Sequence, residues 1–479
     1  MPLSLHSLRR VRVCLSVLTA GLCLPCPWIA ASDAAVRVAE VSASEAVGGE
    51  DAHADVEILH RFNEPEGHQP FTSPLHHRGW IYGATHRGGE HGGGTVYRIG
   101  WDGTGWEVVH HFEPPRGQEP FGDMVVAGER LYGTTKFGGR HRNGTLYSLG
   151  LASEDGFAFA IHHEFGDVSG NLWGPNGPVT VDDRRLYGTA FHGGKARWSG
   201  GAWSYDLETE MFAILASLDP ATGQHPTGRL LWFDGWLWGT MSGYGRTEQG
   251  DYGGVFRVRR DGSDFEVVHR FGNGGPGAHP YDSLSLGPDG RLWGTTFGDF
   301  KSADDPGTVF RLDPATLEVE TIVDFAKLPH AGAKPNGGIL FIGDGRGFFV
   351  THGSDTRGGE TPGTLLELVP PGDGEGGAVA RLRVLWTFDG LETGITPMRS
   401  LTTDGSFLYG VAAFGGIDYG DDGPPDRSGL PRSGGLLYRL KVAPRANAGS
   451  GFDGSNHCSH VGERNGGTPS SSSDKLIER

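Results

Sequence analysis

The sequence predicts an all-β fold, a seven-bladed β-propeller of four-stranded blades whose ring is closed by an N-terminal strand. Three observations carry this prediction. A unit of about fifty residues recurs seven times, each unit holds four short strands, and the array is one strand out of phase at its ends. The 82 glycines among 479 residues fit this fold, because glycine allows the tight turns that join many short strands.

The repeat is defined by a string of the form Leu-Tyr-Gly-Thr-Thr, as at Leu131–Thr135. Its central residue recurs at positions 83, 133, 188, 239, 294, 350 and 410. Around it, each unit has an apolar strand after a proline (A), the string itself (B), a Gly-Thr-Val-Phe-like strand (C) and a strand ending in Phe or Leu (D). Four short strands per unit are typical of a propeller blade. No unit has an amphipathic helical pattern, which excludes helical solenoids, and the shorter rungs of a parallel β-helix disfavour that alternative.

The ends of the array predict how the ring closes. A D-type strand, Ile58–Phe62, precedes the first complete A–B–C set, and the last unit stops after its C strand near Val442. We therefore expect Ile58–Phe62 to pair antiparallel with Gly435–Leu440, which completes the last blade and leaves no open sheet edge.

Strand B combines an aromatic residue with glycine in most units. Glycine weakens a strand unless something needs the space of its missing side chain, so we expect the glycines at 83, 133, 188, 239 and 294 to lie where blades approach closely. The aromatic residue beside each glycine, such as Tyr82 or Trp238, is expected to pack between blades.

The chain is expected to divide into four segments. Its N-terminus combines a basic region, an apolar run at Val13–Leu24 too short to span a bilayer, and small residues suited to cleavage, which predicts a signal peptide. Only Cys458 remains outside that peptide, so no internal disulfide is expected. The segments are a signal peptide at 1–31, a flexible linker at 32–54, the propeller at 55–443 and a disordered Gly/Ser-rich tail at 444–479.

These segments predict a secreted or periplasmic monomer without a transmembrane anchor, exported by either the Sec or the Tat route. The net charge of −17 argues against a nucleic-acid partner, because an acidic surface repels phosphates. The expected partner is a polar extracellular ligand or another protein.

The repeat string also resembles a known family. Leu-Tyr-Gly-Thr-Thr, a Gly-Gly pair and then Gly-Thr-Leu-Tyr, complete at Leu131–Leu149, are similar to the GloVer-type tandem repeat of bacterial choice-of-anchor exported proteins. The resemblance covers about residues 56–442 and implies an exported repeat protein. Members of that group often carry a C-terminal surface-anchoring signal, whereas residues 443–479 here are polar and contain no hydrophobic anchor helix.

The loops on one face predict where a ligand binds. In this strand order the D–A and B–C connections share a face, and the B–C loops are basic in the first three units and acidic in later ones. Such a face suits a polar ligand, a glycan or a peptide, whose acidic group faces the first three blades. The candidate ligand-binding residues are His86, Arg87, Lys136, Arg140, Arg142, His192, Arg197, His225 and His279.

No catalytic residue is predicted, since the sequence has no HExxH string, Gly-x-Ser-x-Gly elbow or sialidase-type Asp box. The sequence leaves calcium open as a cofactor at Asp418, Asp421, Asp422 and Asp426, although a plain acidic turn explains them better. Zinc at His86, His141 and His192 is a weaker alternative. We expect a binding or scaffold module, with a propeller-type lyase or hydrolase acting on extracellular polymer as the alternative.

Overall fold

The computed structural model describes residues 56–151, 156–166, 170–243, 252–272, 277–299, 305–353, 362–371, 379–416 and 434–442, all within one compact unit, Val36–Arg479. The expected signal peptide, linker and tail, and the acidic loop with Asp418, Asp421, Asp422 and Asp426, lie outside the described residues.

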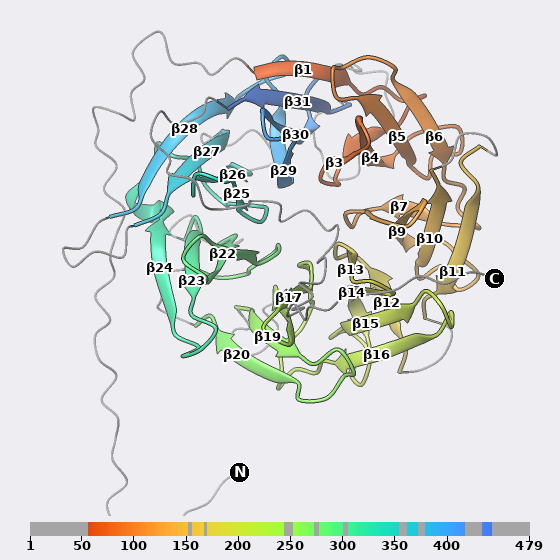
Figure 1. Ribbon diagram of the computed structural model, residues 1–479, viewed down its shortest axis with the longest axis horizontal. Helices are drawn as coiled ribbons and strands as arrows, with labels where there is room; N and C mark the ends of the chain where they lie inside the picture. Colours follow the sequence, from red (N-terminus) through yellow and green to blue (C-terminus); the bar gives the residue numbers. More distant parts are fainter. Residues whose placement is uncertain are drawn as a thin grey trace, which may run out of the picture. The chain divides into compact units, whose positions relative to one another are not determined.

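The described residues form seven antiparallel sheets arranged around a common axis, which is a seven-bladed β-propeller (Figure 1). Within a blade the strands follow one another in chain order from the axis outward, as strands A to D, except that the N-terminal strand is the outermost strand of blade VII. In blades I to III strand A is split in two. The fold class predicted from the sequence is confirmed.

The strands, blade by blade, have the following bounds. Blade I contains β2 (His68–Pro70), β3 (Leu75–His77), β4 (Trp80–Arg87), β5 (Thr95–Gly100) and β6 (Glu107–His111). Blade II contains β7 (Gln118–Pro120), β8 (Val125–Ala127), β9 (Arg130–Phe137), β10 (Thr145–Gly150) and β11 (Phe159–Glu164). Blade III contains β12 (Leu172–Pro175), β13 (Thr180–Val181), β14 (Arg185–Gly193), β15 (Gly201–Asp206) and β16 (Phe212–Ser217). Blade IV contains β17 (Leu231–Phe233), β18 (Trp236–Met241), β19 (Gly254–Val258) and β20 (Glu266–Arg270).

The remaining blades follow the same order. Blade V contains β21 (Ser285–Leu286), β22 (Leu292–Thr296), β23 (Thr308–Leu312) and β24 (Val319–Asp324), after which comes a short 3-10 turn, Phe325–Lys327. Blade VI contains β25 (Leu340–Phe341), β26 (Gly347–Thr351), β27 (Gly363–Val369) and β28 (Arg381–Phe388). Blade VII contains β29 (Ile395–Thr403), β30 (Phe407–Phe414), β31 (Leu436–Lys441) and the N-terminal β1 (Val56–Arg61).

The N-terminal strand closes the ring as expected. β1 pairs antiparallel with β31, with Val56 opposite Leu440. Glu57 of β1 also accepts hydrogen bonds from Arg439 of β31, at 2.7 and 2.8 Å. The same ion pair joins strands C and D elsewhere, so β1 has the chemistry of a D strand as well as its place. The matching pairs are Arg98–Glu107, Arg257–Glu266 and Arg311–Glu320.

The hydrophobic core lies between neighbouring blades, because each sheet must bury both faces against its neighbours. Tyr82 of blade I packs with Leu131 and Tyr147 of blade II, and Trp238 of blade IV packs with Leu292 and Phe310 of blade V. The prediction that the aromatic residues of strand B pack between blades is confirmed.

The glycines of strand B have a different neighbour from the one predicted. A Cβ on Gly83 or Gly133 would overlap the aromatic ring opposite it on strand C of the same blade, Tyr97 or Tyr147. The prediction that these glycines mark close approach between blades is therefore wrong, because the ring that fills the space comes from within the blade. In blade VI the strand register corrects the predicted repeat by one residue, because Phe349 and not Val350 occupies the glycine position of strand B. The sizes are exchanged there, with Phe349 opposite Leu366 on strand C.

Candidate functional site

Among the described residues, the D–A and B–C loops meet at six of the seven blade junctions. In six blades the residue before the proline at the strand-A end of the D–A connection donates its backbone N–H to the B–C loop of the preceding blade, as Glu119 does to Gly93 at 2.9 Å. The proline that follows, such as Pro120, lies against the glycine that begins strand C of that preceding blade, Gly94. The other amide donors are Gln69, Gly174, His225, His279 and Lys334. Both sets of loops thus share one face, as the strand order predicts.

We call the residue before that proline the rim position. It adopts the left-handed backbone conformation in every blade, with φ between 56° and 63°. This conformation is strained by roughly 1 to 3 kcal/mol for a residue other than glycine. Glycine occupies it only in blade III, so six blades keep a side chain at a strained position. The rim positions are Gln69, Glu119, Gly174, His225, His279, Lys334 and Thr396.

Rim side chains lie against the end of strand B in the preceding blade. Glu119 is 3.3 Å from His86, and the imidazole of His225 stacks on Phe191 with ring centres 4.3 Å apart. We call these second residues the shoulder positions, and the strand registers place one in each blade. The shoulder positions are His86, Lys136, Phe191, Ser242, Phe297, His352 and Ala413. The other resolved contacts are Lys334 over Phe297 at 5.1 Å and His279 Nδ1 to the Ser242 carbonyl at 2.6 Å.

Lys136 of blade II is the basic centre of this face. Its ammonium lies over the rings of Phe121 and Phe137, at 5.5 and 5.2 Å from their centres. Burial lowers the pKa of Lys136, with Glu119 opposing that shift and the nearby Arg87 and Arg399 reinforcing it. Within the described residues the Lys136 ammonium has no carboxylate within ion-pair distance. A cation of this kind suits an anionic group on a ligand.

An aromatic group adjoins Lys136 in blade III. Trp173 of β12 and His192 of β14 face each other at 4.1 Å, and Trp198 of the B–C loop contacts both, at 5.4 Å from Trp173 and 5.2 Å from His192. Burial lowers the pKa of both His192 and its neighbour His225 to about 4. Both imidazoles are therefore uncharged at neutral pH.

The axis below the rim is crossed by ionisable side chains. Arg399 of blade VII donates to the carbonyls of Phe71 and Phe121, at 3.0 and 3.2 Å, and lies 3.7 Å from the Asp282 carboxylate of blade V. Burial raises the pKa of Asp282. A second pair, Arg229 and Asp123 at 3.2 Å, joins blades IV and II.

Sequence reasoning missed these axial residues. They stand two or three places after the rim proline, where several units have glycine, as at Gly177 and Gly228. Some units have a charged residue at a position where other units have glycine. This difference was the signal that could have revealed the axial residues.

The sequence-predicted candidates are only partly brought together. His86 and Lys136 lie around Glu119, with Arg87 exposed at the end of β4, and His192 adjoins His225 with ring centres 5.4 Å apart. His279 stands apart, at the junction of blades IV and V. The remaining three candidates lie on B–C loops: Arg197 over the Trp198 ring at 5.4 Å, Arg142 exposed in a turn, and Arg140 beside Glu164 of the outermost strand β11 at 3.7 Å.

The zinc alternative finds no support in the part of the chain that is described. No three His, Cys, Asp or Glu side chains there are placed to hold a metal ion, and this includes His86, His141 and His192. The calcium candidates lie outside that part.

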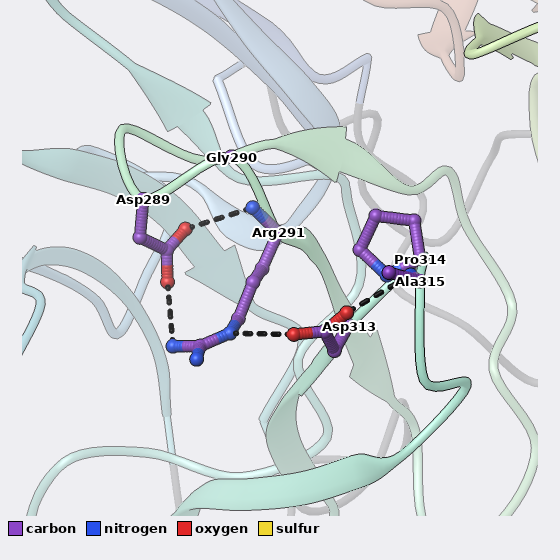
Figure 2. A pocket seen from close by; sticks show the side chains of 6 residues that line it. All are labelled: Asp289, Gly290, Arg291, Asp313, Pro314 and Ala315. Carbon is purple, nitrogen blue, oxygen red and sulfur yellow. Dashed lines mark hydrogen bonds and ion pairs between the residues drawn. The ribbon is translucent and has the colours of Figure 1, made fainter.

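A pocket of about 540 Å³ occurs on the opposite face, at the A–B and C–D turns of blade V (Figure 2). Arg291 lies between the carboxylates of Asp289 and Asp313, at 3.8 and 3.5 Å. Asp289 also accepts hydrogen bonds from Trp293 at 2.9 Å and Arg311 at 3.2 Å. The charged groups of this pocket are thus paired with one another, which is the pattern of a network that stabilises turns.

The ring and its rim define the chain as a β-propeller with one variable loop face. The model of the Gloeobacter/Verrucomicrobia repeat matches residues 50–251 and 244–423, and the chain belongs to this repeat family. The family resemblance of the Leu-Tyr-Gly-Thr-Thr string is thereby confirmed. No curated protein matches the chain. Within the described residues, no helix has the length and apolar character needed to cross a membrane.

Solved structures share the fold at low identity. Oligogalacturonate lyase from Vibrio parahaemolyticus is 14% identical, with a TM-score of 0.50 over 82% of this chain and 95% of that one. Oligogalacturonate lyase in complex with manganese has the same identity and TM-score over 82% and 94%. A GH74 enzyme from Niastella koreensis is 13% identical, with a TM-score of 0.47 over 74% and 52%.

Proposed function

We propose that the protein is exported and holds a polar extracellular ligand, a glycan or a peptide, on the face where the D–A and B–C loops meet. One observation carries the proposal. Six of seven rim positions keep a side chain in a left-handed conformation that glycine would adopt without strain. The backbone strain at the rim positions opposes folding, and their side chains differ from blade to blade. We therefore infer that these side chains are not kept for packing the ring.

The charges of this face favour an anionic ligand. Because the pKa of His192 and of His225 is about 4, the positive charge at neutral pH comes from lysine and arginine. Lys136 has no carboxylate partner among the described residues, and the guanidinium of Arg399 acts on it from the axis. An acidic group of the ligand would bind at Lys136, on the side of the first three blades.

The alternative is a propeller-type lyase or hydrolase that acts on extracellular polymer. The Arg399–Asp282 pair favours it, since two ionisable groups from blades VII and V converge beneath the rim. A carboxyl group whose pKa is raised by burial, next to a guanidinium, is an arrangement that acid–base chemistry uses.

The test is a glycan and peptide array probed with the secreted protein, followed by product analysis of every ligand that binds. Lys136→Met should weaken the binding of acidic ligands about tenfold, because it removes a charged hydrogen-bond donor. Lys441→Met, an exposed lysine at the end of β31 on the opposite face, is the matched control and should leave affinity unchanged. Equal loss in both variants would place the ligand elsewhere, and a cleaved product would select the enzymatic alternative.

A further inference from the structure

One junction of the ring differs from the rest. Where blade II meets blade III, the shoulder residue is Lys136 and the rim residue is Gly174, so no rim side chain covers the lysine. Elsewhere Glu119 covers His86, and His225 covers Phe191. The junction is intact all the same, since the amide of Gly174 donates to the Asn143 carbonyl at 2.8 Å.

The space beside Gly174 is open. A Cβ built on Gly174 would have a single neighbour within 4 Å, the Cδ2 atom of His192 at 3.7 Å, which is ordinary van der Waals contact. The backbone at Gly174, with φ of 63°, matches that of the side-chain-bearing rim residues. The missing side chain therefore leaves a notch, and among the described residues only His192 comes within 4 Å of where its Cβ would stand.

The junction with the notch carries a cation, Lys136 at the shoulder position, and an indole, Trp198 of the B–C loop of blade III. Trp198 is 54% exposed, and its indole makes T-shaped contacts with Trp173 and His192. Its loop is held in place by hydrogen bonds, including Gly193 N–H to the Arg197 carbonyl at 2.9 Å. Strand β9, which ends in Lys136 and Phe137, contacts strand β12, which carries Trp173 and Gly174, and Trp198 packs on Trp173, so cation and indole belong to the same junction.

We infer that this notch is a subsite for a uronic acid unit of an acidic glycan, with the carboxylate at Lys136 and the apolar face of the sugar ring against Trp198. A uronic acid carries an apolar C–H face and a carboxylate on one ring, which matches an exposed indole and an ammonium that has no carboxylate within ion-pair distance in the described part of the chain. An acidic peptide would satisfy the lysine and leave the indole exposed. This inference rests on the proposed binding function and adds the position and chemical class of the ligand.

Calorimetric titration with three probes tests it: trigalacturonate, its methyl ester and triglutamate. Wild-type protein should bind trigalacturonate at least about tenfold more tightly than the methyl ester, which keeps the ring and lacks the charge. Lys136→Met should lose about tenfold in affinity for trigalacturonate, and Trp198→Ala about fivefold. Trp101→Ala, which removes an indole that is 50% exposed on the opposite face, should change nothing.

Gly174→His is the decisive variant. It places in the notch the residue that the next junction already carries in the same backbone conformation, so it should fold and lose trigalacturonate binding. Gly174→Asn is the second variant, because asparagine tolerates positive φ well, and the melting temperature of both confirms folding.

Three results would overturn the inference. The first is triglutamate binding as tightly as trigalacturonate with no effect of Trp198→Ala. The second is trigalacturonate binding that survives Gly174→His and is lost in Lys334→Met, which would move the subsite to blade VI and leave the proposed function standing. The third is no binding of any probe by the wild type, in which case the array alone decides the proposed function.

Discussion

The two faces of the ring treat polar side chains in opposite ways. On the A–B and C–D face the same arrangement recurs, in which an aspartate of the A–B turn accepts a hydrogen bond from the aromatic residue of strand B. It joins Asp182 to Tyr187, Asp289 to Trp293 and Asp404 to Tyr409, at 2.8, 2.9 and 2.7 Å. On the rim face the backbone bonds repeat while the side-chain pairs differ at each junction. Interactions that recur from blade to blade stabilise the ring. We therefore expect a ligand to bind on the face where the side-chain pairs differ between blades.

The largest effect is expected from removing a repeated element altogether. Deleting residues 32–64 removes β1, and with it the D strand of blade VII and the Arg439–Glu57 ion pair. We expect the melting temperature to fall by about 10 °C or more in one cooperative transition, because an opened ring exposes a sheet edge and a blade interface. Deleting residues 32–54, which spares β1, is the control for calorimetry. An unchanged melting temperature in the longer deletion would refute closure by β1.

Next in size is a change at a repeated glycine. Gly133→Val should destabilise the protein by roughly 1 to 3 kcal/mol, because its side chain would meet the Tyr147 ring in a packed interior. Gly272→Val is the matched control, since a Cβ there has no neighbour within 4 Å and its φ is not positive. Urea denaturation measures both.

The exchanged pair of blade VI sharpens this prediction. The hypothesis is that the glycine makes room for the aromatic ring opposite it on strand C. If so, Gly133→Phe combined with Tyr147→Leu should recover part of the stability lost by Gly133→Phe alone. Additive losses in the double variant would show that the glycine backbone matters and the ring does not.

The contrast between faces predicts opposite phenotypes for two polar variants. Asp289→Ala should cost roughly 1 to 3 kcal/mol of stability, because Trp293 and Arg311 lose a buried acceptor, and should leave ligand affinity unchanged. Lys136→Met should leave stability nearly unchanged and weaken binding. Thermal melts and titrations with the same ligand separate the two outcomes. A Lys136→Met variant that melts like Asp289→Ala would make the lysine a structural residue.

The smallest effect concerns pH. The folded protein holds the pKa of His110, His192 and His225 at about 4, below the usual 6.5. The neutral imidazoles favour the folded state, so this contribution is complete above about pH 6.5 and is lost as pH falls toward 4. Melting temperature should decline over that window, and the decline should be shallower in His192→Gln/His225→Gln. An identical slope in that variant would contradict the assignment.

Much of the fold was predictable because every blade must pack on its neighbours in the same way. That requirement places apolar residues such as Tyr82 and Trp238 in a period that can be counted along the chain. The role of the glycines was misjudged, since a sequence does not say whether Tyr97 lies over Gly83 from its own blade or from the next. The candidates on blades I to III included Lys136 and His192 but also Arg140, whose side chain turns to Glu164 at the outer edge.

The sequence by itself determined the number of blades, the closure by Ile58–Phe62 and the face on which the loops diverge, because these follow from a period and from the phase of its ends. Only the tertiary structure decided which side chains meet. Arg399 reaches carbonyls 328 and 278 positions away in the chain, at Phe71 and Phe121. Gly174 leaves Lys136 uncovered because it has no side chain at a position where the other six blades have one. The sequence does not show that this position faces Lys136. Contacts across a closed ring join residues whose separation in the chain carries no signal. The sequence therefore predicted the face on which the loops diverge, and it could not predict which side chains meet there.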